Sequence, residues 1–136
     1  MKEALPVQQA ILTPDAPPPN GFYSQAVQAG PMLYVSGQLP VREGQVVAES
    51  AAEQTRFVLQ SIRAILRAAG GDLGNVVQVT IYIADIALWS EVNAVYQEVL
   101  GAVPVPPARC IVPVKELHFG AKVEIQATAY LPGSAR

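Results

Sequence analysis

The segment Lys122–Leu131, KVEIQATAYL, alternates between polar and apolar side chains along its whole length. Successive side chains of a β-strand point to opposite faces of the sheet, so this period of two predicts a strand with one buried face. The apolar set is Val123, Ile125, Ala127, Ala129 and Leu131. The polar set, with Glu124, Gln126 and Thr128, meets water or another subunit. A sheet with one apolar face needs a covering layer, which the rest of the chain has to supply.

Two predicted amphipathic helices can supply that layer. The first follows the capping box Ser50–Glu53, and its apolar residues recur at helical spacing until Gly70 and Gly71 end it. For the second, Asp85 is placed to act as the N-cap. The apolar stripe of this second helix comprises Trp89, Val92, Tyr96 and Val99, with Asn93 beside it.

The remaining patterns predict strands. Residues 76–83 alternate, 26–29 and 32–36 flank Gly30-Pro31 as a hairpin, and 108–114 form an apolar run. The expected order is β-β-α-β-α-β-β. We therefore predict one α+β domain over residues 1–136, with two helices on one face of a mixed sheet. Residues 1–15 are expected to form an extended N-terminal arm.

The composition restricts the class of protein. Of 136 residues, 51% are hydrophobic and 15% charged, which favours a homo-oligomer with apolar surface between its subunits. The net charge of −2 and the scattered Lys and Arg residues argue against nucleic-acid binding. A single cysteine excludes an internal disulfide and a multi-cysteine zinc site. No apolar run is long enough to span a membrane, so a cytoplasmic location is the default expectation.

Two charged residues stand inside predicted strands. Arg109 lies in the apolar run PPARCIVPV and can bind a carboxylate through two parallel hydrogen bonds. Its alternative role is an ordinary strand-end arginine paired with an acid. Glu124 can act as a general base or position a water molecule. Its alternative role is a cross-strand partner for a cation, Arg109 included.

Other polar residues carry weaker signals. Cys110 points away from Arg109 in a regular strand, and burial as a small apolar residue is favoured over a nucleophilic role. Tyr23, Ser36 and Asn93 lie among apolar residues, where structural hydrogen bonding is the common explanation. The residues alone thus give a domain with an Arg/Glu pair and no cofactor signature.

Five motifs occur in register over residues 16–131: GFYSQAV (21–27), VSGQLP (35–40), VNAVYQ (92–97), PPARCIV (106–112) and KVEIQATA (122–129). Together they resemble the RidA/YjgF family of reactive-intermediate deaminases. The resemblance implies a chorismate-mutase-like α+β fold, assembled as a homotrimer with sites between subunits. It also implies cofactor-independent hydrolysis of 2-imino acids and their enamine tautomers, such as 2-aminoacrylate and 2-iminobutanoate, to 2-keto acids and ammonia.

The resemblance also assigns roles to particular residues. It makes Arg109 the carboxylate-binding residue and Glu124 the acid that positions the attacking water. It places Tyr23 and Ser36 at the cleft and the backbone of Cys110 near the substrate nitrogen. Asn93 receives a supporting role. No metal and no nucleic-acid partner is implied for this site.

The chain departs from the usual family pattern around the cleft, at Phe22, Cys110, His118 and Gln126. These changes suggest an altered substrate preference. One alternative is therefore a 2-aminomuconate-type deaminase, which a second cation from His118 or Lys122 would favour. Another is a non-catalytic, trimeric ligand-binding or chaperone-like protein. A ribonuclease or translation inhibitor is the least favoured.

Overall fold

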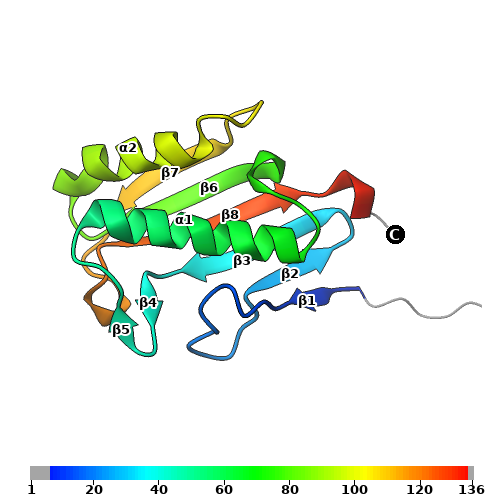
Figure 1. Cartoon of the computed structure of the whole chain (residues 1–136), viewed down its shortest axis with the longest axis horizontal. Helices are drawn as coiled ribbons and strands as arrows, with labels where there is room; N and C mark the ends of the chain where they lie inside the picture. The colour runs from blue at the N-terminus through cyan, green and yellow to red at the C-terminus, as the bar shows by residue number, and fades with distance from the viewer. Residues whose placement is uncertain (1–6, 135–136) are drawn as a thin grey trace, which may run out of the picture.

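The structure, a computed structural model, describes residues 7–134. Its main feature is a six-stranded sheet with the strand order β1-β2-β3-β8-β6-β7 (Figure 1). The strands are β1 (Gln9–Ile11), β2 (Ala26–Ala29), β3 (Met32–Gln38), β6 (Val76–Ile83), β7 (Ala108–Pro113) and β8 (Val123–Tyr130). β6 and β7 run parallel, and all other neighbours run antiparallel. The mixed sheet expected from the sequence is confirmed.

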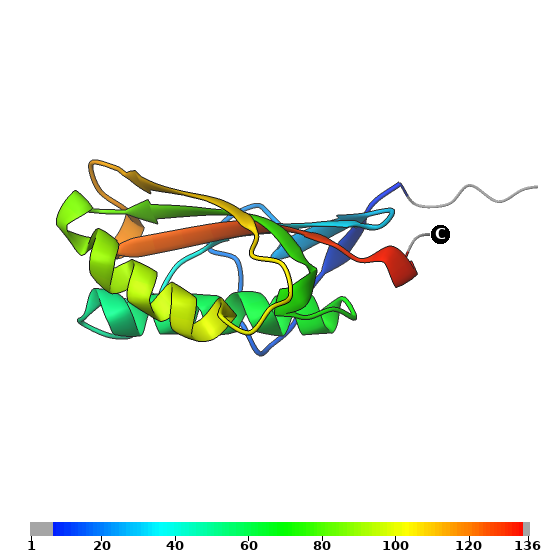
Figure 2. The same ribbon diagram turned by 90° about the horizontal axis from the view of Figure 1, so that it is seen from above.

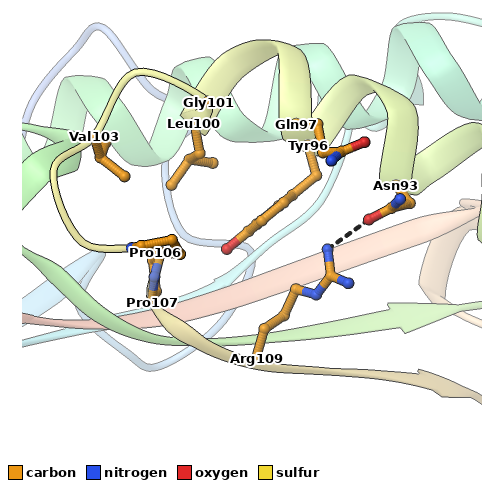
Figure 3. Close-up of a pocket in the computed structure, with 9 residues that line it drawn as sticks. All are labelled: Asn93, Tyr96, Gln97, Leu100, Gly101, Val103, Pro106, Pro107 and Arg109. Carbon is orange, nitrogen blue, oxygen red and sulfur yellow. Dashed lines mark hydrogen bonds between the residues drawn. The ribbon is translucent and has the colours of Figure 1, made fainter.

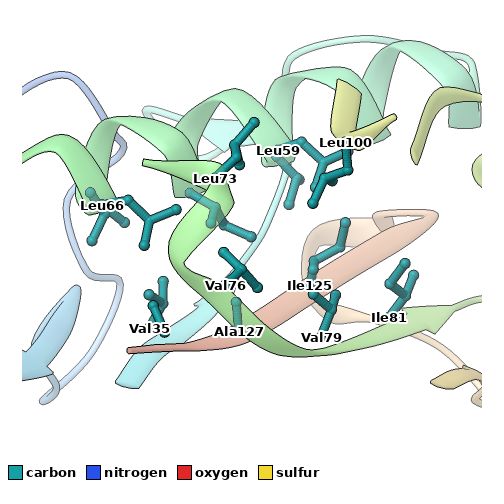
Figure 4. Packing of buried hydrophobic residues seen from close by; sticks show 14 of the residues in the cluster. Val35, Leu59, Leu66, Leu73, Val76, Val79, Ile81, Leu100, Ile125 and Ala127 are labelled. Atoms are coloured by element: carbon teal, nitrogen blue, oxygen red, sulfur yellow. The ribbon is translucent and has the colours of Figure 1, made fainter. Parts of the chain in front are cut away.

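Two helices, α1 (Ala51–Ala68) and α2 (Trp89–Leu100), cover one face of the sheet, as Figure 2 shows. The apolar residues of the alternating segment 122–131 lie on this face, each at most 5% exposed. They pack with apolar residues of β6, β3 and α1 between the two layers (Figure 4). The predicted α+β architecture is therefore confirmed, and the polar side chains of β8 lie on the uncovered face. None of the helices within residues 7–134 is both long and apolar enough to cross a membrane.

The two helices begin differently. Ser50 Oγ accepts a hydrogen bond from the backbone N–H of Glu53 at 3.0 Å, so the predicted cap of α1 is confirmed. The prediction that Asp85 caps α2 is wrong. Its carboxylate accepts a hydrogen bond from the N–H of Ala87 and begins the short 3₁₀ helix η2 (Ile86–Leu88). This extra turn separates Asp85 from α2, whose start has no side-chain cap.

Three short strands had no signal in the sequence. β1 lies within the predicted N-terminal arm, where residues 9–11 pair with β2, while residues 1–6 of that arm lie outside the described residues. β4 (Val41–Arg42) and β5 (Gln45–Val46) form a separate hairpin after β3. Its turn passes through Glu43 and Gly44, both with positive φ.

Candidate functional site

Arg109 lies on β7, the edge strand next to β6, and points toward α2. Its register partner is Val79, which is buried on the helix-covered face. Its Nη1 donates a hydrogen bond to Asn93 Oδ1 at 2.8 Å. None of the ion pairs found within residues 7–134 involves Arg109. The alternative of an arginine paired with an acid of its own chain is therefore not observed.

Two aromatic rings of α2 complete the surroundings of the guanidinium group. Its carbon lies 4.7 Å from the ring centre of Tyr96 and 5.7 Å from that of Trp89. Both distances are within the range of cation–π attraction. Trp89, Asn93 and Tyr96 follow each other at intervals of four and three residues, which places them on one side of the helix. One stripe of α2 therefore fixes the position of Arg109.

A hollow of about 550 Å³ opens beside this arginine, between α2 and the segment that leads to β7. Figure 3 shows Arg109 and Asn93 at one end and Val103 with Pro106 toward the other. Its full lining is Asn93, Tyr96, Gln97, Leu100, Gly101, Val103, Pro106, Pro107 and Arg109. We call it the arginine hollow.

The Tyr96 side chain is only 8% exposed, and its hydroxyl has no hydrogen-bond partner within the described residues. Burial raises the pKa of this phenol, and the positive charge of Arg109 partly offsets the rise. The hydroxyl therefore stays protonated, and its unmade hydrogen bond is a cost to the folded state.

Glu124 lies on the opposite, uncovered face of the sheet. Its neighbours Val123 and Ile125 are fully buried under the helices, so the alternation of β8 directs Glu124 away from them. It lines a second hollow, of about 370 Å³, with Asn20, Tyr23, Ser36, Gly37, Leu39 and His118. We call it the glutamate hollow. Burial raises the pKa of the Glu124 carboxyl above its ordinary value of 4.5, and His118 opposes this rise.

A β-bulge in β3 shapes the glutamate hollow. Val35 pairs with Ala127 and Gln38 with Ile125, so β3 has one residue more than β8 over this interval. Within the bulge, the Glu124 carboxylate lies against Gly37, where a Cβ atom would overlap its oxygen. Only glycine leaves that space free.

The two polar residues predicted at the cleft are positioned by backbone contacts. Ser36 Oγ donates a hydrogen bond to the carbonyl oxygen of Ser24 at 2.6 Å. The Tyr23 hydroxyl accepts one from the backbone N–H of Asn20 at 3.1 Å. Both side chains line the glutamate hollow, with lone pairs or a proton left for a ligand.

The predicted site residues thus separate into two groups. Arg109 and Asn93 line the arginine hollow, while Tyr23, Ser36 and Glu124 line the glutamate hollow on the other face. Glu124 is opposite Tyr82 in the β6–β8 register and makes no ion pair within residues 7–134. The alternative of an Arg109–Glu124 cross-strand pair is therefore wrong for this chain.

Cys110 lines neither hollow. The prediction that it is buried is wrong, because its side chain is exposed on the uncovered face of edge strand β7. The apolar run 108–114 suggested burial, but a strand at the sheet edge with one uncovered face buries only part of its surface. Among residues 7–134, no three His, Cys, Asp or Glu side chains are grouped so that they could hold a metal ion.

Sequence reasoning missed three functional features. The apolar stripe predicts that Trp89 and Tyr96 belong to the core. Their spacing with Asn93 also allows these three side chains to surround one cation. His118 does line the glutamate hollow, as its expected place around the cleft indicates, but its stacking on Phe119, with ring centres 4.0 Å apart, had no signal in the sequence. The role of Gly37 had no signal, because it depends on the bulge.

Comparisons with known proteins agree with this architecture. The profile of the family described as "Endoribonuclease L-PSP" matches residues 13–131. A RutC family protein of Pyrococcus horikoshii is 41% identical over 126 residues, which cover 91% of this chain and 98% of that protein. Reactive Intermediate Deaminase A of Arabidopsis thaliana, a chloroplastic protein, is 38% identical over 91% of this chain and 66% of its own. The crystal structure of E. coli TdcF with bound serine superposes with a TM-score of 0.84 at 32% identity, covering 90% and 98% of the two chains.

Proposed function

The chain belongs to the endoribonuclease L-PSP family, which is the RidA/YjgF family, and on this premise we propose that it is a deaminase. It hydrolyses 2-imino acids and their enamine tautomers to 2-keto acids and ammonia, without a cofactor. The observation that carries the proposal is the Arg109 guanidinium, positioned by Asn93 and two aromatic rings and left without a carboxylate partner within residues 7–134. The 38% identity to a reactive intermediate deaminase supports it.

We propose that a complete site needs a second copy of the chain. Because Arg109 and Glu124 are on opposite faces of one sheet, one substrate molecule meets both groups where the arginine hollow of one subunit faces the glutamate hollow of the next. A closed ring repeats one such heterologous contact, and the proposed ring is a homotrimer with three sites. The uncovered sheet face supports assembly, because Tyr34, Tyr130 and Val77 are exposed there by 50%, 47% and 44%.

The proposed reaction needs few groups. The substrate carboxylate binds the free edge of Arg109, which fixes the imine carbon relative to Glu124 of the neighbouring subunit. The Glu124 carboxylate accepts a proton from water as the water oxygen bonds to the imine carbon. It then passes this proton to the former imine nitrogen, which restores the carboxylate. The resulting carbinolamine then breaks its C–N bond, and Glu124 helps transfer the hydroxyl proton to the leaving nitrogen. The products are the 2-keto acid and ammonia, with one water consumed.

The 2-aminomuconate alternative requires a second cation in the cleft. Lys122 does not line either hollow, and its Nζ donates a hydrogen bond to the carbonyl oxygen of Glu49 at 2.7 Å. His118 lines the glutamate hollow, beside the acid that the reaction needs. Because the negative charge of Glu124 lies beside His118, it disfavours a second substrate carboxylate there. We therefore favour a substrate with one carboxylate.

The test measures keto-acid release from 2-aminoacrylate and 2-iminobutanoate, both generated in place by a pyridoxal-phosphate-dependent dehydratase. Wild type is compared with Arg109→Ala and Glu124→Gln. The proposal expects wild type to exceed spontaneous hydrolysis and both variants to lose most of that excess. If only Arg109→Ala lost this activity, Glu124 would have no part in the mechanism. No excess by wild type on any imine would overturn the proposed function.

A further inference from the structure

The arginine hollow is larger than the smallest imino acids require. Its volume of about 550 Å³ lies within the range of sites that take substantial organic ligands. A 2-imino acid derived from alanine has only three carbons, and binding its carboxylate to Arg109 would fill only one end. The remaining space can hold a further part of a larger ligand.

The wall beyond Arg109 is apolar. Figure 3 shows Leu100, Val103 and Pro106 away from the guanidinium, in the part of the hollow next to the segment before β7. Leu100 belongs to the buried core cluster and Val103 packs against it, so this wall is supported from behind. Such a surface binds hydrocarbon and discriminates by its size.

Charge also limits the occupant. Among the described residues, Arg109 is the only cation that lines the arginine hollow, and no acid lines it. A ligand therefore finds one cation for one carboxylate, the polar side chains of Asn93 and Gln97 near it, and the apolar wall at the other end (Figure 3). The glutamate hollow is different, since Asn20, Tyr23, Ser36, His118 and Glu124 make most of its lining polar.

We propose that the arginine hollow is the side-chain subsite of the deaminase, and that its preferred substrates are 2-imino acids with long apolar side chains. This inference rests on the proposed function. The carboxylate at Arg109 holds the first carbon, the imine carbon faces the neighbouring subunit's acid, and the side chain lies along Leu100, Val103 and Pro106. Each substrate carbon that is buried against this wall strengthens binding of the transition state and so raises kcat/KM.

The test compares kcat/KM for imines of alanine, leucine and glutamate, each generated in place by a flavin-dependent amino-acid oxidase. Wild type should prefer the leucine imine to the alanine imine by at least about tenfold. The glutamate imine, with a second carboxylate against an apolar wall, should be the poorest of the three.

A pair of variants assigns the preference to this wall. Val103→Arg places a cation in the subsite, and should lower kcat/KM for the leucine imine about tenfold while raising it for the glutamate imine. Val105→Arg is the matched control, because Val105 is 73% exposed on the same segment and lies outside the hollow. Val103→Ala, a smaller change, should reduce the leucine preference alone, and thermal unfolding verifies that each variant is folded.

The outcomes separate the two proposals. Activity that is equal on alanine and leucine imines, or higher on the alanine imine, overturns the subsite and leaves the deaminase standing. A preference for leucine that both arginine variants leave unchanged also overturns it. No activity on any imine, with folded protein, rejects the proposed function itself.

Discussion

Arg109 and Glu124 lie on opposite faces of the same sheet. Their strands, β7 and β8, flank β6 on either side, but Arg109 is in register with buried Val79 and Glu124 with Tyr82 on the uncovered face. The backbone of β6 therefore lies between the two functional groups. A reaction that uses both on one small molecule requires two chains, and this requirement links the proposed chemistry to the proposed assembly.

The space at Gly37 is predicted to be essential for the glutamate hollow. In Gly37→Ala, the added methyl group would overlap the Glu124 carboxylate and displace it, so kcat/KM should fall about tenfold or more. Gly133→Ala is the control, because a Cβ there meets no atom within 4 Å. Unchanged kcat/KM in folded Gly37→Ala would show that Glu124 does not need its observed position.

His118 is predicted to set the acid limb of the pH profile. Glu124 must be ionised to accept a proton, so activity falls as the pH drops through its pKa, which burial places above 4.5. His118 opposes that rise, and His118→Gln should raise the pKa further and move the acid limb of kcat/KM to higher pH. Lys115→Gln, outside both hollows, should leave the limb in place. A limb that stays in place or moves to lower pH in His118→Gln contradicts this role.

The ring of Tyr96 is predicted to position Arg109, whereas its hydroxyl is predicted to contribute neither to stability nor to substrate binding. Tyr96→Phe removes the buried, unpartnered oxygen, so the free energy of unfolding should rise by about 1 kcal/mol with KM unchanged. Tyr96→Leu also removes the ring from the guanidinium and should raise KM several-fold, since cation–π attraction is worth about 1 kcal/mol. Chemical denaturation and steady-state kinetics measure both. A higher KM in Tyr96→Phe would instead give the hydroxyl a role in binding.

Asp72 is predicted to make the fold sensitive to acid. The hydrogen bond from Arg63, with others from the N–H of Leu73 and from Arg67, lowers its pKa to about 2. A carboxyl with a lowered pKa in the folded state stabilises it above the unfolded pKa, and this contribution disappears as the pH falls from about 5 to 2. Asp72→Asn should therefore be less stable at neutral pH and lose less stability on acidification. Parallel stability curves for the two proteins would contradict this.

The sequence predicted the features that depend on local pattern. The alternation of residues 122–131 correctly indicated the buried face of β8, and the Ser50 capping box correctly indicated the start of α1. The bulge at Gly37 and the pairing of β1 were not predictable in this way, because both depend on contacts with strands distant in the sequence. Local pattern also misled at Asp85, where the extra 3₁₀ turn comes before α2.

The same limit applies to the candidate site. Arg109 and Glu124 stood out because charged residues are unusual inside such strands, and the family resemblance gave each a role. Their separation by the sheet required the register of β6 with both neighbours, and the aromatic environment of Arg109 required the packing of α2 on β7. The burial predicted for Cys110 is wrong because its exposure follows from the edge position of β7.

The most direct test mixes two inactive variants. Arg109→Ala and Glu124→Gln are co-expressed with different tags, and mixed assemblies are purified through both tags. If each site takes Arg109 from one chain and Glu124 from its neighbour, some sites in a mixed assembly contain both native residues. In a mixed trimer one of the three sites then has both native residues, so the purified mixed assemblies should show about one third of wild-type keto-acid release. Mixed assemblies that stay as inactive as either variant alone would contradict a site shared between subunits.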